Sequence, residues 1–344
     1  MSLPSTTPTY TFSIPSIHDR LRLDCRIYLP PDLHKRLLHG SSSSDRPLLR
    51  GAIIAHPYAP LGGCFDDPVV GVVGGEVLRL GCVVGTFNFR GAGGSEGRTS
   101  WTARPELADY VSFYGFMLLY LHFLGQRAVQ QEGGGDRGKI GVILGGYSYG
   151  SMIASHLPKL HDIVDLVRWS SPESPFHEIY QIAEKLSLCL SLGEGMKQPT
   201  YRPATVEEMR SAADSIKLTA AVSYLLVSPL LPPVNQFLTL FSKMSLDASA
   251  QTSSAPGQGK QGQIPCPKPA DQLCAHETLA IFGDEDTFTS ASKLEKWSAE
   301  LAHAPGSRFQ AVEIEGAGHF WREHGVEAQA RQAIRDWVCQ MSTS

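Results

Sequence analysis

Short runs of consecutive apolar residues, each followed by a helical pattern, constrain the fold of this chain more than any other feature. Residues 51–55 (GAIIA) and 139–144 (KIGVIL) are apolar almost throughout, which is typical of strands buried on both faces. Strands that alternate with helices in this way form a mostly parallel sheet covered by helices on both sides. We therefore expect an α/β protein whose first two strands, joined by a short turn, form an antiparallel edge.

The positions of these elements follow from the two kinds of pattern. The predicted strands are Tyr10–Ile14, Arg20–Tyr28, Arg50–Ala55, Cys82–Phe89, Ile140–Gly145, Ser223–Ser228, Thr278–Phe282 and Phe309–Ile314. The predicted helices are Val69–Leu80, Glu106–Leu124, Tyr149–Leu157, Ser290–Leu301 and Val326–Met341.

Two segments depart from this alternation. Residues 171–218 are helical and punctuated by prolines, and we predict that they form a lid over the strand ends. Residues 247–271 are rich in Ser, Gln, Gly and Pro, which predicts a flexible polar loop. At 344 residues the chain is long enough for one large domain with insertions, so residues 1–170 and 219–344 are the expected core.

Charge and cysteine usage argue against several classes of function. The net charge is −4 and no basic stripe occurs, so we expect no nucleic-acid partner. Seven cysteines form no C-x-x-C pair, and free thiols without a metal or other cofactor are expected. The first residues lack a signal-peptide pattern, and the longest apolar-rich run, Val111–Leu124, is too short to span a bilayer. These features predict a cytoplasmic protein with no membrane span.

The strongest chemical signal is residues 146–150 (GYSYG), which lie between a predicted buried strand and a predicted helix. A G-x-S-x-G at such a junction forms a tight, strained turn that places the serine hydroxyl above the sheet. Ser148 is therefore the predicted nucleophile. The N–H of Tyr149, at the helix N-terminus, is a predicted donor to an oxyanion. Outside this context the same pattern would indicate only a glycine-rich structural turn.

A serine hydroxyl is a poor nucleophile until a base takes its proton. His319 follows the last predicted strand within a glycine-containing loop, residues 315–320 (EGAGHF), and is the predicted base. Residues 284–286 (DED) follow the strand before it and supply three acids, any of which would orient the histidine. Alternatively, all three acids cap the helix that begins near Ser290. The order serine, acid, histidine differs from that of chymotrypsin and subtilisin.

A second oxyanion donor is expected in residues 56–63 (HPYAPLGG), which follow the strand GAIIA. Pro57 has no N–H, so the donor is the amide of Tyr58 or, as the weaker alternative, that of Ala59. We interpret His56 as a residue that orders this loop.

Residues 89–97 (FRGAGGSEG) superficially resemble a dinucleotide-binding loop. The third glycine of G-x-G-x-x-G would fall at Glu96, so the pattern fails. We interpret the segment as a turn that shapes one wall of the cleft.

From about Arg20 to Trp337 the chain resembles the α/β-hydrolase superfamily. It is similar to small hydrolases with the motifs H-P-x-x-x-x-G-G, F-N-x-R-G-x-G-x-S-x-G and G-x-S-x-G, which match residues 56–63, 87–97 and 146–150. In this superfamily the acid commonly lies three residues after the glycine that ends its strand, which selects Asp286 over Asp284. The resemblance implies an α/β-hydrolase fold and a reaction class.

The chain departs from these small relatives at residues 171–218 and 247–271, so the resemblance implies no particular substrate. We expect a serine hydrolase that cleaves a small-molecule carboxylic ester or thioester with Ser148, His319 and Asp286, with Tyr58 and Tyr149 forming the oxyanion hole. Acyl transfer, peptide or amide cleavage, and ligand binding without turnover are the alternatives. The acyl length and the oligomeric state are not readable from the sequence.

Overall fold

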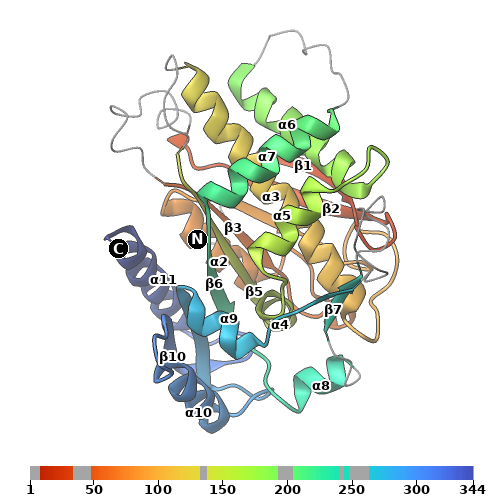
Figure 1. Cartoon of the computed structure of the whole chain (residues 1–344). Coiled ribbons are helices and arrows are strands. Elements are labelled where there is room, and N and C mark those ends of the chain that lie inside the picture. The colour runs from red at the N-terminus through yellow and green to blue at the C-terminus, as the bar shows by residue number, and fades with distance from the viewer. Residues whose placement is uncertain are drawn as a thin grey trace.

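A central sheet with the strand order β1-β2-β4-β3-β5-β6-β9-β10 organises the protein (Figure 1). The computed structural model describes residues 8–33, 48–131, 138–192, 204–239, 244–247 and 263–343. The strands of the sheet are β1 (Tyr10–Pro15), β2 (Arg22–Tyr28), β3 (Leu49–Ala55), β4 (Val83–Phe87), β5 (Ile140–Tyr147), β6 (Ala220–Val227), β9 (Thr278–Glu285) and β10 (Phe309–Gly318). The pairs β1–β2 and β2–β4 are antiparallel, and the other neighbours are parallel. The predicted antiparallel edge and parallel centre are thus confirmed.

Helices cover both faces of this sheet, and each face has its own apolar core. On one face lie α2 (Pro68–Arg79) and α11 (Val326–Thr343), which pack against each other. The other face is covered by α3 (Arg104–Gln131), α4 (Tyr149–Ser155), α5 (Leu160–Arg168), α6 (Pro175–Leu192), α7 (Val206–Thr219), α9 (Pro269–Ala275) and α10 (Ala291–Ala302). Smaller elements are the 3-10 helix η1 (Ala59–Leu61), α8 (Val234–Leu238) and the hairpin of β7 (Ser245–Asp247) and β8 (Gln263–Pro265).

Local sequence signals account for several helix boundaries. Asp67 caps α2, because its carboxylate accepts a hydrogen bond from the amide of Val69 (2.8 Å). Pro68 follows at the first helical position, where its missing N–H costs nothing. At the start of α7, Thr205 and Glu208 form a reciprocal capping box.

Helix α3 lies at the centre of the larger core. By length and composition alone its residues Arg104–Ala128 would be able to cross a membrane, but the apolar window is buried within the protein. Gly115 on this helix lets α6 approach closely, because a Cβ there would lie 2.3 Å from the Phe176 ring. The apolar composition of α3 is thus explained by contacts inside the fold.

The predicted insertion, residues 171–218, contains α6 and α7, with residues 193–203 outside the described part of the chain. Helix α6 packs on α3 and β1, whereas α7 packs on α5 and α3 (Figure 1). The apolar residues Phe176, Ile179 and Tyr180 are buried in these contacts and serve as core packing. A lid role for the insertion stays a prediction.

The predicted polar loop, residues 247–271, differs from the structure at its ends. Asp247 closes β7, Gln263–Pro265 form β8, and α9 begins at Pro269. Residues 248–262 lie outside the described part.

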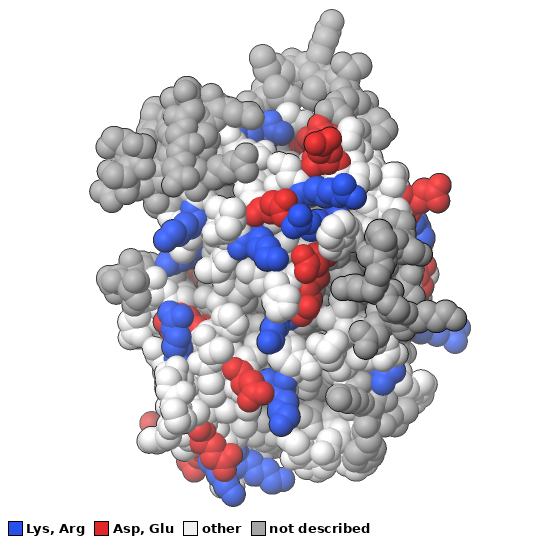
Figure 2. Space-filling view, in the orientation of Figure 1, with Lys and Arg blue, Asp and Glu red and all other residues white. Residues whose placement is uncertain are grey.

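On the face seen in Figure 2, the described acidic and basic side chains are interspersed.

Candidate active site

The junction of β5 and α4 presents Ser148 in a strained turn. Its φ of 54° and ψ of −111° lie in a region that non-glycine residues rarely adopt. Gly146 permits this turn, because a Cβ there would lie 2.4 Å from the carbonyl carbon of Gly150. Gly150 lets α4 approach the end of β3, because a Cβ there would lie 2.4 Å from the carbonyl oxygen of Ala55. The elements β5 and α4 therefore meet as closely as the sequence motif requires.

Three strand ends bring Ser148, His319 and Asp286 together. The Oγ of Ser148 lies 2.9 Å from Nε2 of His319, and Nδ1 of His319 lies 2.7 Å from Oδ2 of Asp286. Because an ionised carboxylate only accepts, Nδ1 carries the proton, and Nε2 of the neutral ring accepts from the Ser148 hydroxyl. All three side chains are buried. The arrangement is a continuous hydrogen-bonded chain from hydroxyl to imidazole to carboxylate.

Asp286 and Asp284, two of the three acids at the end of β9, have different hydrogen-bond partners. Oδ1 of Asp286 accepts hydrogen bonds from the amides of Phe288 (2.8 Å) and Thr289 (3.0 Å). Burial alone would raise the pKa of Asp286, but the hydrogen bond and charge of His319, with the two amides, outweigh it and lower the pKa. Asp284 instead accepts from the amide of Gly316 (2.7 Å), which links β9 to the loop before His319.

The loop after β3 lies beside the start of α4. The carbonyl oxygen of Tyr58 accepts from the amides of Leu61 (3.1 Å) and Gly63 (3.2 Å), which folds the loop into η1. The rings of Tyr58 and Tyr149 approach to a centroid distance of 5.1 Å. Tyr149 is the first residue of α4, so its amide has no carbonyl partner within the helix.

Within the described residues, no group of three or more His, Cys, Asp or Glu side chains is arranged to hold a metal ion.

Comparison with known proteins identifies the family of the chain. A model described as the alpha/beta hydrolase family matches residues 37–332, which is most of the chain. The chain belongs to the alpha/beta hydrolase family. No protein with a curated description matches it.

Solved structures share the fold of this α/β hydrolase at low identity. A putative α/β hydrolase of unknown function from Agrobacterium tumefaciens is 16% identical, with 96% of this chain and 96% of its own covered and a TM-score of 0.51. Est1E from Butyrivibrio proteoclasticus, solved with ferulic acid bound, is 11% identical, with coverage of 97% and 100% and a TM-score of 0.50. An α/β serine hydrolase homologue from Coxiella burnetii is 15% identical, with coverage of 96% and 98% and a TM-score of 0.49.

Tyr147 is a site residue of this α/β hydrolase that the sequence did not reveal. It ends β5 immediately before Ser148, and its hydroxyl donates a 2.7 Å hydrogen bond to the backbone carbonyl of His319. Trp321 lies two residues after His319, and its Nε1 donates a hydrogen bond to the Oγ of Ser228 (2.9 Å). Both bonds hold the loop that carries His319, so we expect Tyr147 to act as a positioning residue that joins the serine turn to the histidine loop.

We expect Tyr147→Phe to lower kcat about five-fold with little change in KM, because the histidine loop loses one hydrogen bond of about 1 kcal/mol. Steady-state kinetics and the unfolding midpoint would measure this. Tyr110→Phe is the matched control, since the Tyr110 hydroxyl donates to a backbone carbonyl, that of Gly145 (2.9 Å), away from the loop. Equal losses of kcat in both variants would contradict a positioning role.

His56 orders the loop before the 3-10 helix, as expected from the sequence. Its Nε2 accepts from the amide of Phe89 (2.9 Å), so Nδ1 carries the proton and donates to the carbonyl of Pro57 (2.6 Å). The ring is fully buried, and this burial lowers its pKa from 6.5 to about 4. His56 is therefore neutral and ties the loop after β3 to the end of β4.

This pKa shift predicts a loss of stability in acid. In the unfolded chain the His56 imidazole binds a proton below about pH 6.5, whereas in the folded protein it stays neutral until about pH 4. The contribution of neutral His56 to the free energy of unfolding is therefore complete above pH 6.5 and is lost as the pH falls from 6.5 to about 4. We expect His56→Gln to be less stable at neutral pH but to lose less of its remaining stability between these limits. Urea unfolding at both limits, with the exposed His324→Gln as control, would test this. An equal acid loss in His56→Gln and wild type would contradict it.

The segment 89–97 is a loop held by the buried guanidinium of Arg90. Arg90 makes a two-pronged contact with Asp109, in which Nε lies 2.9 Å from Oδ2 and the second nitrogen 2.7 Å from Oδ1. It also bonds Asp19 (2.8 Å). Gly93 is required because a Cβ there would lie 2.2 Å from the Asn88 amide nitrogen. Gly93 is therefore explained by the close packing of the backbone of this segment against the Asn88 side chain.

Proposed function

We propose that this α/β hydrolase cleaves carboxylic esters or thioesters of small molecules by two-step acyl transfer on Ser148. The observation that supports the proposal most strongly is the hydrogen-bonded chain Ser148–His319–Asp286, with distances of 2.9 and 2.7 Å. Such a chain gives the hydroxyl a base and gives that base a fixed tautomer. The family and the fold agree with this reaction class.

In the first step Oγ of Ser148 attacks the acyl carbonyl while Nε2 of His319 takes its proton. The carbonyl oxygen becomes an oxyanion, for which the amides of Tyr149 and Tyr58 are the proposed donors. Collapse breaks the bond to the alcohol or thiol, which leaves with the proton from His319. In the second step His319 takes a proton from water, and the water oxygen adds to the acyl carbonyl. The bond to Oγ of Ser148 then breaks, His319 returns its proton to Oγ, and the carboxylic acid is released. Asp286 stabilises the imidazolium formed in each step.

The first test is covalent labelling of the wild-type protein by a fluorophosphonate, read by intact mass, followed by turnover of p-nitrophenyl esters and acyl thioesters. One adduct and release of acid from the esters are expected. An adduct whose acyl group passes to added alcohol or amine, but not to water, would indicate an acyltransferase instead. Absence of any adduct on folded protein, with ligand binding retained, would favour a non-catalytic binding protein.

A further inference from the structure

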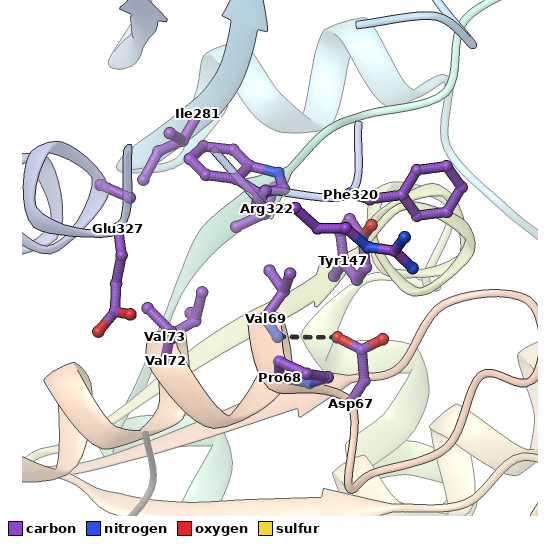
Figure 3. Close-up of a pocket in the computed structure, with 13 residues that line it drawn as sticks. Asp67, Pro68, Val69, Val72, Val73, Tyr147, Ile281, Phe320, Arg322 and Glu327 are labelled. Atoms are coloured by element: carbon purple, nitrogen blue, oxygen red, sulfur yellow. Dashed lines mark hydrogen bonds between the residues drawn. The ribbon is translucent and has the colours of Figure 1, made fainter. Parts of the chain in front are cut away.

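A cavity of about 360 Å³ lies beside the candidate active site, between α2 and the segment that follows His319 (Figure 3). Its lower wall is α2, with Val69 and Val73, and Ile281 lies in its upper wall. Trp321 also lines the cavity. This volume is at the lower end of the range for small-molecule sites, and the apolar walls are typical of them. The proposed reaction leaves this cavity without a role.

The walls of the cavity are fixed rather than loose. Val73 and Ile281 belong to the buried core behind it, and Asp67 caps α2 at its edge. Trp321 has a φ of 53° and is held by the bond from Nε1 to Ser228 (2.9 Å). A pocket built from such elements exists before its ligand arrives, so binding does not require reorganisation of the fold.

Charged residues line the two ends of the cavity, and their partners differ. Asp67 accepts from the amide of Val69 (2.8 Å), and Glu327 pairs with Arg331 (2.7 Å). The guanidinium of Arg322 lies over the Phe320 ring, 5.3 Å from its centroid, at the same end as Asp67 (Figure 3). Within the described residues, no carboxylate oxygen lies within 4.0 Å of the guanidinium nitrogens of Arg322. Arg322 is therefore the charged group at this cavity that is able to take an anion from outside.

We infer that the cavity binds a small anionic amphiphile, with an aliphatic or aromatic body between α2 and Trp321 and a single carboxylate-like group on Arg322. Apolar walls with one polar group at the rim fix the orientation of such a ligand. Arginine suits a carboxylate because its planar donors match the two oxygens. The inference is independent of turnover at Ser148.

The position of the cavity links its occupant to the catalytic loop. Tyr147 lines it and bonds the carbonyl of His319, and Phe320 lines it and directly follows His319. A ligand here would touch the two residues that adjoin the serine and the histidine in sequence.

Binding is tested on Ser148→Ala protein labelled with 5-fluorotryptophan, using 4-phenylbutyrate as the probe and 4-phenylbutylamine as its cationic counterpart. The chain has five tryptophans, and Trp321→Phe assigns the relevant ¹⁹F resonance. We expect 4-phenylbutyrate to shift the Trp321 resonance saturably, and to bind about five-fold more tightly than the amine, the effect of one exposed ion pair.

Two variants and a control locate the ligand. Val72→Phe fills the cavity from a half-buried position on α2 and should abolish the shift. Arg322→Gln should weaken 4-phenylbutyrate about five-fold and should not weaken the amine, whose ammonium group the arginine repels. Arg308→Gln, an exposed change at the start of β10, should have no effect. No saturable shift, or a shift that survives Val72→Phe, would overturn the inference. Fluorophosphonate labelling of the wild type reports separately on the proposed function.

Discussion

Replacing Ser148 with alanine is expected to abolish fluorophosphonate labelling and to reduce ester hydrolysis by at least about 10⁴-fold, because the acyl group then has no nucleophile to which it can transfer. The residual rate would come from substrate binding and from the proposed oxyanion donors alone. Intact-mass analysis counts the adducts, and initial rates with a p-nitrophenyl ester measure the loss. The substitution removes one oxygen and keeps the backbone, so the fold should be retained.

Ser151→Ala is the matched control for this experiment. Ser151 lies one turn further along α4, is buried, and donates its hydroxyl to the carbonyl of Ser148 (2.7 Å). This variant should be labelled at nearly the wild-type rate. If labelling persists in Ser148→Ala or disappears in Ser151→Ala, Ser148 is not the nucleophile and the proposed mechanism is wrong.

Much of the fold was predictable from local patterns. The strand order is not encoded locally, but apolar runs such as residues 139–144 are typical of strands buried on both faces, and this run pairs with β3 on one side and β6 on the other. Helix α5 is not among the helices predicted from the sequence, because it is short and close to prolines, although Ile163, Val164 and Val167 follow helical spacing. The short β7 and β8 strands lie within polar sequence and are defined by pairing with each other.

The site was predictable where chemistry depends on residue type and motif, and not where it depends on the path of the backbone. Residues 146–150 identify the turn, but the residues alone left three acids open after β9. The choice depends on how the chain turns beyond Gly283, where the amide of Asp286 bonds back to the Gly283 carbonyl (3.4 Å). The contact of Tyr147 was not predictable for a similar reason. Its partner, His319, lies far away in the sequence and contributes only a backbone carbonyl.

Asp286→Asn is therefore the most informative change after Ser148→Ala, and we expect it to lower kcat by about 10³- to 10⁴-fold. An asparagine retains an oxygen for the amides of Phe288 and Thr289, so the turn after β9 should be kept. Its NH₂ group, however, would donate to Nδ1 of His319. The ring would then carry its proton on Nε2, facing Ser148, and would be unable to take a proton from the hydroxyl.

Asp284→Asn provides the matched comparison, because it makes the same chemical change two residues away. An asparagine there still accepts from the amide of Gly316, now bonded to Asp284 at 2.7 Å, so kcat should change by no more than about three-fold. Both variants should be compared in kcat and in the rate of fluorophosphonate labelling. A greater loss in Asp284→Asn would mean that the acid rearranges during turnover, because in this structure the hydrogen-bonded chain from Ser148 through His319 ends at Asp286.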